Sequence, residues 1–294
     1  MLSLHHSVGS ASSSTILALV LVSSLYLRGW RRLHVKPVNS IPGWRLTSFL
    51  LGVSLVWGAL ASPLVADDHE LLTVHMIQHL LLMTFAPPLI LLGEPLLAFW
   101  QGLPQFARNV LSRLFQLRFV QHFGRMLSHP IMCWIVSALV LIGWHVPAVF
   151  TLAMHSEAWH AIEKTTFLGA GFLFWWPVVQ VWPSDSTQPK WSTILYLFLA
   201  TLPCDILSGF LVFSDSVAYP VFLTIPRHFG FSVLQDQQCA AALMWTCITI
   251  VYLVPAAAIS TKLLGPQVSN GHNLARRRSH IAESRTDAQQ LGAV

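Results

Sequence analysis

Seven apolar stretches dominate the sequence and limit what it can fold into. They cover approximately residues 15–27, 44–64, 71–92, 130–150, 161–182, 191–213 and 234–260. A helix of about 20 apolar residues crosses the hydrocarbon core of a bilayer. Inside that core the backbone must satisfy its hydrogen bonds internally, as a helix does. The pattern therefore predicts an all-α, polytopic membrane helix bundle with seven transmembrane helices.

The composition agrees with a membrane protein. Only 10% of the 294 residues are charged, against roughly 25% in a soluble domain. The formal net charge of +5 comes from Lys and Arg residues between the apolar stretches, where such residues control topology, so it does not indicate nucleic-acid binding. The four cysteines lack a CxxC spacing, which is typical of small buried side chains and not of a disulfide or zinc framework.

Lys and Arg residues are distributed unequally between alternate loops. One set of loops, together with the carboxyl-terminal tail, carries fifteen of them, and the other set carries only Lys164 and Arg227. Because cytoplasmic loops are enriched in Lys and Arg, we expect the amino terminus outside the cell and the carboxyl terminus in the cytoplasm. The first stretch lacks a preceding basic segment and a small-residue cleavage site, so we expect it to be retained as a span.

The same pattern divides the chain. Residues 1–262 are predicted to form the transmembrane domain, and residues 263–294 a basic tail that we expect to be disordered. Within the domain, residues 101–128 combine apolar positions at helical spacing with four arginines. This segment is either an amphipathic helix on the anionic inner surface of the membrane or an ordinary basic loop.

The third apolar stretch contains the motif HMIQH, with His75 and His79 four residues apart. On a helix, side chains at this spacing project from one face about 6 Å apart, so both can reach one metal ion. Polar rings inside a membrane are costly unless they are paired, hydrated or coordinated, which makes such a pair a candidate functional site.

The expected topology brings further histidines to the same depth. His145 lies at the outer end of the fourth stretch, and His160 lies at the outer start of the fifth. Asp236 begins the seventh stretch, where it either caps a helix amino terminus or supports a metal site. Each of these side chains, taken alone, could equally be a hydrogen-bonded residue of the bundle.

Methionines lie beside this set. Met76, His79 and Met83 are spaced i, i+3 and i+7, although methionines in apolar helices commonly only fill gaps. Because thioether and imidazole ligands suit copper, a His/Met site favours copper, with zinc as the closest competitor. No Ser/His/Asp order, catalytic carboxylate pair or glycine-rich phosphate loop is present, so we do not expect an enzyme. The predicted metal ligands are His75, His79, His145, His160, Asp236, Met76 and Met83.

Several motifs resemble those of the CtaG-type cytochrome c oxidase assembly factors of bacterial membranes. They are SPL at 62–64, HMIQHLLLMTFAPPLILLGEP at 75–95, HP at 129–130, WHVP at 144–147, FWWP at 174–177 and DQQCAAALMW at 236–245. The resemblance implies a multi-pass protein of the bacterial inner membrane that helps to assemble a haem-copper oxidase and supplies copper. It implies oxidase subunits, other copper chaperones and membrane lipid as partners. The residues it points to are His75, His79, His145, His160 and Asp236.

Two other functions remain open from the sequence. In a haem b electron carrier or membrane reductase, His79 and either His145 or His160 would ligate one iron. In a metal-free scaffold for oxidase subunits, the histidines would only form hydrogen bonds.

Overall fold

The computed structural model of the chain describes residues 2–34, 42–62, 70–179, 190–225, 230 and 232–264. All regular elements among these residues are helices, which confirms the all-α prediction. The predicted tail, apart from its first two residues, falls outside them. In chain order the elements are α1 (Leu2–His34), α2 (Gly43–Ala61), α3 (Leu72–His79), the π-helix η2 (Leu80–Phe85), α4 (Ala86–Leu92), α5 (Pro95–Gly102), α6 (Gln105–Phe115), α7 (Arg118–Leu127), α8 (Pro130–His145), α9 (Pro147–His155), α10 (Glu157–Val179), α11 (Lys190–Phe213), the 3-10 helix η3 (Pro220–Leu223) and α12 (Val233–Leu264).

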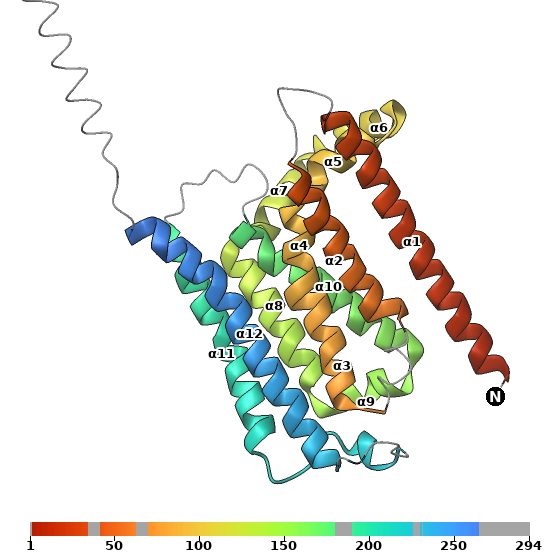
Figure 1. Cartoon of the computed structure of the whole chain (residues 1–294), viewed down its shortest axis with the longest axis vertical. Coiled ribbons are helices and arrows are strands. Elements are labelled where there is room, and N and C mark those ends of the chain that lie inside the picture. Colours follow the sequence, from red (N-terminus) through yellow and green to blue (C-terminus); the bar gives the residue numbers. More distant parts are fainter. Residues whose placement is uncertain are drawn as a thin grey trace, which may run out of the picture.

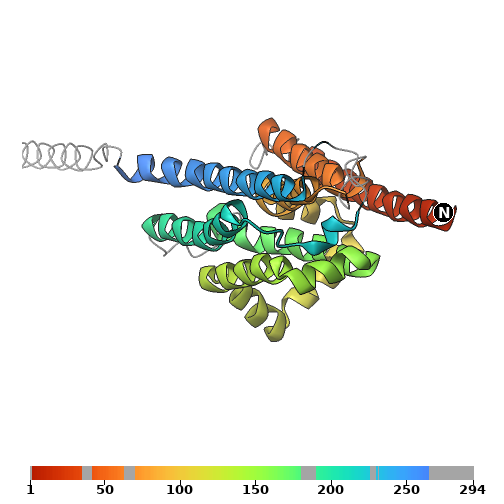
Figure 2. The same ribbon diagram turned by 90° about the horizontal axis from the view of Figure 1, so that it is seen from below.

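The long helices run side by side along the molecule (Figure 1). The view from below in Figure 2 shows α12 beside α11 and α11 beside α8. The described part of the chain has five helical spans long and apolar enough to cross a membrane, namely Ser13–His34, Gly43–Ala61, Leu72–Leu92, Trp191–Phe213 and Val233–Thr261. The pair α7 and α8, bent by 70°, gives a sixth if the two helices count as one span.

The fourth predicted stretch is broken within the bundle. Residues 130–150 were expected to form one helix, but α8 ends at His145 and α9 begins at Pro147. Proline disfavours helical backbone in the residue before it, and Val146 is indeed extended, with φ −66° and ψ 123°. The break places His145 in the last turn of α8.

The third stretch contains a π-helix directly after His79. Pro87 and Pro88 follow this segment, and a proline inside a helix removes a backbone donor and crowds the carbonyl four residues earlier. A π-helical turn relieves such a conflict and is frequent at functional sites. Gly171 of α10 packs against it, because a Cβ at this position would lie 2.7 Å from the Met83 carbonyl oxygen. This close approach brings α10 alongside the central helix.

Residues 101–128 contain two helices, α6 and α7, whereas the sequence allowed a single amphipathic helix. The chain turns between α6 and α7, and no described residue of α6 is buried. Its large apolar side chains, including Phe106 and Leu114, are exposed.

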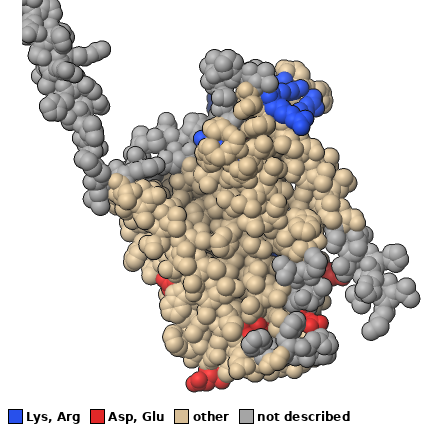
Figure 3. All heavy atoms as spheres, viewed as in Figure 1, with Lys and Arg blue, Asp and Glu red and all other residues tan. Residues whose placement is uncertain are grey.

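Charged residues separate along the bundle. In Figure 3, Lys and Arg side chains gather at the end that carries α5 and α6, whereas Asp and Glu side chains show in the opposite half. The described start of α1 and the described end of α12 lie at opposite ends (Figure 1).

Candidate metal centre

Two histidines of the candidate centre come from α3. His75 is completely buried and His79 is 6% exposed. Their ring centroids are 4.3 Å apart, as expected for side chains four residues apart on one helix face. The prediction that they share a face is therefore confirmed.

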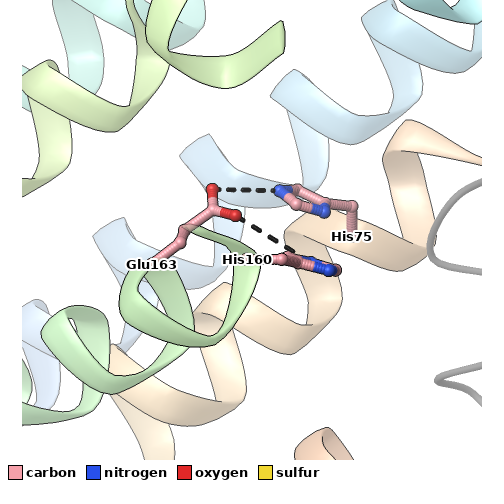
Figure 4. Close-up of side chains that lie close together, drawn as sticks. All are labelled: His75, His160 and Glu163. Atoms are coloured by element: carbon pink, nitrogen blue, oxygen red, sulfur yellow. Dashed lines mark ion pairs between the residues drawn. The ribbon is translucent and has the colours of Figure 1, made fainter. Parts of the chain in front are cut away.

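Helix α10 supplies a third histidine and a carboxylate. His160 and Glu163 lie one turn apart, and their side chains lie beside His75 of α3 (Figure 4). The ring of His160 stacks on that of His75 at 5.5 Å between centroids. Because α10 packs against η2 and α4, which continue α3 along the chain, these four polar side chains come together inside the bundle.

Glu163 lies at the centre of this group. Its Oε1 is 3.4 Å from Nε2 of His75 and 3.4 Å from Nε2 of His79, and its Oε2 is 3.9 Å from Nε2 of His160. Tetrahedral coordination with bonds of about 2.0–2.1 Å separates neighbouring ligand atoms by about 3.4 Å. The nitrogens and oxygens are therefore spaced like the ligands of one ion, with donor atoms of His75, His160 and Glu163 all within 4.8 Å of one another.

The buried charge of Glu163 needs a partner. The side chain has no solvent exposure, and among the described residues neither of its oxygens nor any ring nitrogen of His75 or His79 forms a hydrogen bond. An isolated carboxylate in such surroundings is strongly unfavourable, whereas a bound cation or a protonated histidine offsets its charge. The residues present therefore fit a metal ion by charge as well as by spacing.

His145 adds a fourth imidazole at the edge of the group. Its ring lies 6.5 Å from that of His79. Nδ1 is 2.7 Å from the Leu141 carbonyl oxygen, which can only accept, so Nδ1 carries the proton and Nε2 carries the lone pair. Nε2 has no hydrogen-bond partner within the described structure, which leaves it able to bind a ligand.

Asp236 supports α3 from the neighbouring helix. Its carboxylate accepts hydrogen bonds from the backbone amides of Leu72 and Thr73 at 2.9 and 3.1 Å and from the Thr73 hydroxyl at 2.7 Å. Both oxygens thus cap the amino terminus of α3, the helix that carries His75 and His79. The capping alternative is observed, but on a different helix from the one expected.

The two methionines lie in the hydrophobic core. Met76 is buried on α3, and Met83 lies on η2 beside a cavity of about 20 Å³ that is also lined by Trp134, Cys204 and Tyr252. None of the histidines lines that cavity. Coordination by Met76, Met83 and Asp236 stays a prediction.

Aromatic side chains cover the centre on the side of the acidic half. Phe150 of α9 packs against His75 at 5.1 Å, and Tyr219 and Phe222 pack against Phe150 at 4.4 and 5.9 Å between ring centroids. The Tyr219 hydroxyl donates to the His145 carbonyl oxygen at 3.2 Å, and burial raises the pKa of this phenol. Gln237 holds the connection that bears Tyr219, through the Ala218 amide and the Ser216 carbonyl.

Sequence reasoning missed Glu163 as a site residue. In the sequence, Glu163 stands next to Lys164 near a predicted helix start. Charged side chains at such positions are commonly solvated, so the residue did not suggest a site. Two signals could have identified it: the i, i+3 spacing from His160, which places both residues on one helix face, and the cost of an acid inside an apolar stretch.

Comparisons with known proteins agree with the motifs. The profile of the family described as "Cytochrome c oxidase caa3 assembly factor (Caa3_CtaG)" matches residues 24–265. An uncharacterised protein of Mycobacterium bovis is 26% identical over 234 residues, which are 76% of this chain and 34% of that protein. An uncharacterised protein of Mycobacterium leprae is 24% identical over 279 residues, which are 91% of this chain and 40% of that protein.

The match spans 34% to 40% of the length of these curated relatives, and no solved structure matches the chain significantly. The family profile nevertheless covers every helix that contributes to the histidine and glutamate group, from α3 to α10, and extends through α12. The chain therefore belongs to the cytochrome c oxidase caa3 assembly factor family.

Proposed function

We propose that this protein assists cytochrome c oxidase assembly by holding a copper ion, as cargo, between α3 and α10. The observation that supports this function is the position of the Glu163 carboxylate 3.4 Å from two imidazole nitrogens, all three side chains being buried. His75, His79, His160 and Glu163 would provide the ligands, with His145 available as a further imidazole.

The donor set favours copper or zinc over the alkaline-earth ions. Imidazole nitrogen suits copper and zinc, and copper(II) binds a given nitrogen and oxygen site most tightly among the divalent first-row metals. Copper binding at this centre does not require thioether ligands, because three imidazole nitrogens and one negatively charged carboxylate already supply donor atoms for the ion. The connection of the family with cytochrome c oxidase supports copper over zinc as the proposed cargo.

The membrane arrangement in this proposal has seven spans, with the metal centre near the outer surface of a bacterial inner membrane. Two helices, α8 and α10, complete the bundle beside the five long apolar spans. The Lys and Arg side chains at the α5 and α6 end would face the cytoplasm. His145 and the aromatic cover then lie toward the outside, where copper would be handed to oxidase subunits directly or through other chaperones.

Haem is a weaker candidate for the same histidines. The ring of Phe167 stacks on His79 at 4.0 Å and lies 6.4 Å from His145. A porphyrin ligated by these two imidazoles would need the space that Phe167 fills. An absorption spectrum of the purified protein tests this alternative, because a bis-histidine haem gives a strong Soret band.

The test of the proposed function combines binding with assembly. We expect the His75→Ala/His79→Ala double variant to lose bound copper, measured by elemental analysis of the purified protein. In cells it should lower oxidase activity, and added copper should partly restore that activity. His155→Ala is the matched control, because His155 is exposed on α9 and its ring bonds only the Thr151 carbonyl in the described structure. Unchanged copper stoichiometry in the double variant would refute the copper proposal and leave a scaffolding role.

A further inference from the structure

A large groove lies along the bundle away from the metal centre. It has a volume of about 1490 Å³ and is bounded by α7, α8, α10 and α11, together with Phe115 at the end of α6. None of the four histidines of the centre, and not Glu163, lines it. Its volume exceeds the roughly 300–1,000 Å³ of pockets that hold small molecules, so the groove can accept a larger, elongated ligand.

One end of the groove is polar and basic. Arg125 and Gln121 of α7 lie there with Ser128 and His129, at the end of the bundle where α7 meets the start of α8 (Figure 1). No Asp or Glu is among the described residues that line the groove. This end therefore complements a negatively charged group.

Aromatic side chains border the basic end. Trp176 near the end of α10 and Trp191 at the start of α11 both line the groove. Tryptophan is enriched at the level of lipid headgroups, where its apolar ring and polar N–H are both satisfied. The basic end thus has the character of the membrane interface, while the remainder of the groove has that of the hydrocarbon region.

The rest of the groove is apolar and exposed. Ile131 is 59% exposed on α8, and Leu199 and Ile206 are 40% and 74% exposed on α11. These residues extend from the basic end toward the middle of the bundle. Such a surface needs an apolar cover, which aliphatic chains supply.

The length of the groove favours a lipid over a partner helix as its occupant. From residue 191 to residue 206 of α11 the helical rise gives about 22 Å, and from residue 130 to residue 142 of α8 it gives about 18 Å. A partner helix crossing the membrane would need a surface of about 30 Å. One leaflet comprises about half of that hydrocarbon thickness plus a headgroup region, which matches the groove.

We propose that this groove is a binding site for an anionic phospholipid, whose phosphate contacts Arg125 and His129 and whose acyl chains lie along α8 and α11. Basic sites between membrane helices bind anionic headgroups in this way. The proposal goes beyond oxidase assembly and depends on neither the metal nor its identity.

The test uses the full-length protein, purified in detergent and stripped of lipid. Native mass spectrometry would compare the binding of phosphatidylglycerol with that of phosphatidylcholine carrying the same acyl chains. We expect preferential binding of phosphatidylglycerol. Arg125→Gln should weaken it about tenfold, the scale of one lost charge-assisted contact. It should weaken phosphatidylcholine binding less, because the choline cation of that lipid already offsets the phosphate charge. Arg125→Lys should keep the preference, because it keeps the charge.

Arg113→Gln is the matched control, since Arg113 lies on α6 and does not line the groove. Leu199→Trp, which fills the apolar part, should weaken the binding of both lipids. Equal binding of the two lipids by the unmodified protein, or an unchanged preference in Arg125→Gln, would overturn the proposal. A photoreactive residue at position 199 that captures a membrane polypeptide in place of lipid in native membranes would also overturn it, in favour of a partner helix.

Discussion

Glu163 of α10 faces His75 of α3 with a carboxylate oxygen 3.4 Å from the imidazole Nε2, and both side chains are completely buried. No hydrogen bond joins these two atoms. Their separation is that of two ligands on one ion, and their burial makes the carboxylate charge costly without one.

Glu163→Gln should sharply weaken metal binding. The substitution keeps the size of the side chain but removes the negative charge and one good oxygen ligand. Loss of a residue that only contacts a metal ligand typically lowers metal affinity by roughly 10–100-fold, so the loss of a direct ligand should lower it by at least about tenfold. Titration with copper in detergent measures this change. Glu157→Gln, in the exposed first turn of the same helix, should bind normally. Equal affinities for all three proteins would show that Glu163 is not a ligand.

Asp236→Asn should act mainly through α3. An amide has one acceptor oxygen in place of two, and it loses the favourable interaction of a negative charge with the helix amino terminus. We expect a loss of about 1–3 kcal/mol in unfolding free energy, measured by reversible unfolding in mixed micelles, and a smaller fall in copper affinity than for Glu163→Gln. Asp215→Asn, at an exposed position, is the control. A greater loss of affinity than in Glu163→Gln with unchanged stability would instead support Asp236 as a ligand.

Gly171→Ala should separate α10 from the π-helix. The new Cβ would lie 2.7 Å from the Met83 carbonyl oxygen and from a ring carbon of Pro87, and overpacking of this kind costs about 1–3 kcal/mol. Gly169→Ala is an internal control, because a Cβ there meets no atom within 4 Å, and alanine stabilises a helix by about 0.5–1 kcal/mol relative to glycine. Unfolding of both variants tests the close contact. Equal stabilities would contradict it.

Tyr219→Phe should speed metal exchange. It removes the hydroxyl contact with the His145 carbonyl while keeping the aromatic ring over Phe150, so the cover should open more often at a cost of about 1 kcal/mol. The rate of copper transfer to an external chelator should rise severalfold. Tyr196→Phe loses a comparable hydrogen bond, to the Phe174 carbonyl, at a position remote from the cover, and should leave that rate unchanged. If both variants release copper at the same rate, Tyr219 does not hold the cover.

Much of the site could be predicted because some of its residues lie close together in the sequence. The four-residue spacing in HMIQH places His75 and His79 on one face of any helix. The length of the surrounding apolar stretch indicates that this helix lies in a membrane. Convergence of His145 and His160 on this pair followed from counting spans and their direction. Glu163 was missed because two of its three partners, His75 and His79, come from another helix, so its burial could not be judged from its own neighbours in sequence.

The sequence by itself determined a helical membrane protein, the pairing of His75 with His79 on one face and the family to which the chain belongs, because periodicity, apolar length and short motifs are properties of adjacent residues. Only the tertiary structure decided that α10 approaches η2 and α4 through Gly171, that Glu163 lies between the imidazoles, and that Asp236 caps α3 from another helix. These relationships depend on how helices pack against one another. The distances between their side chains arise only when the bundle has formed.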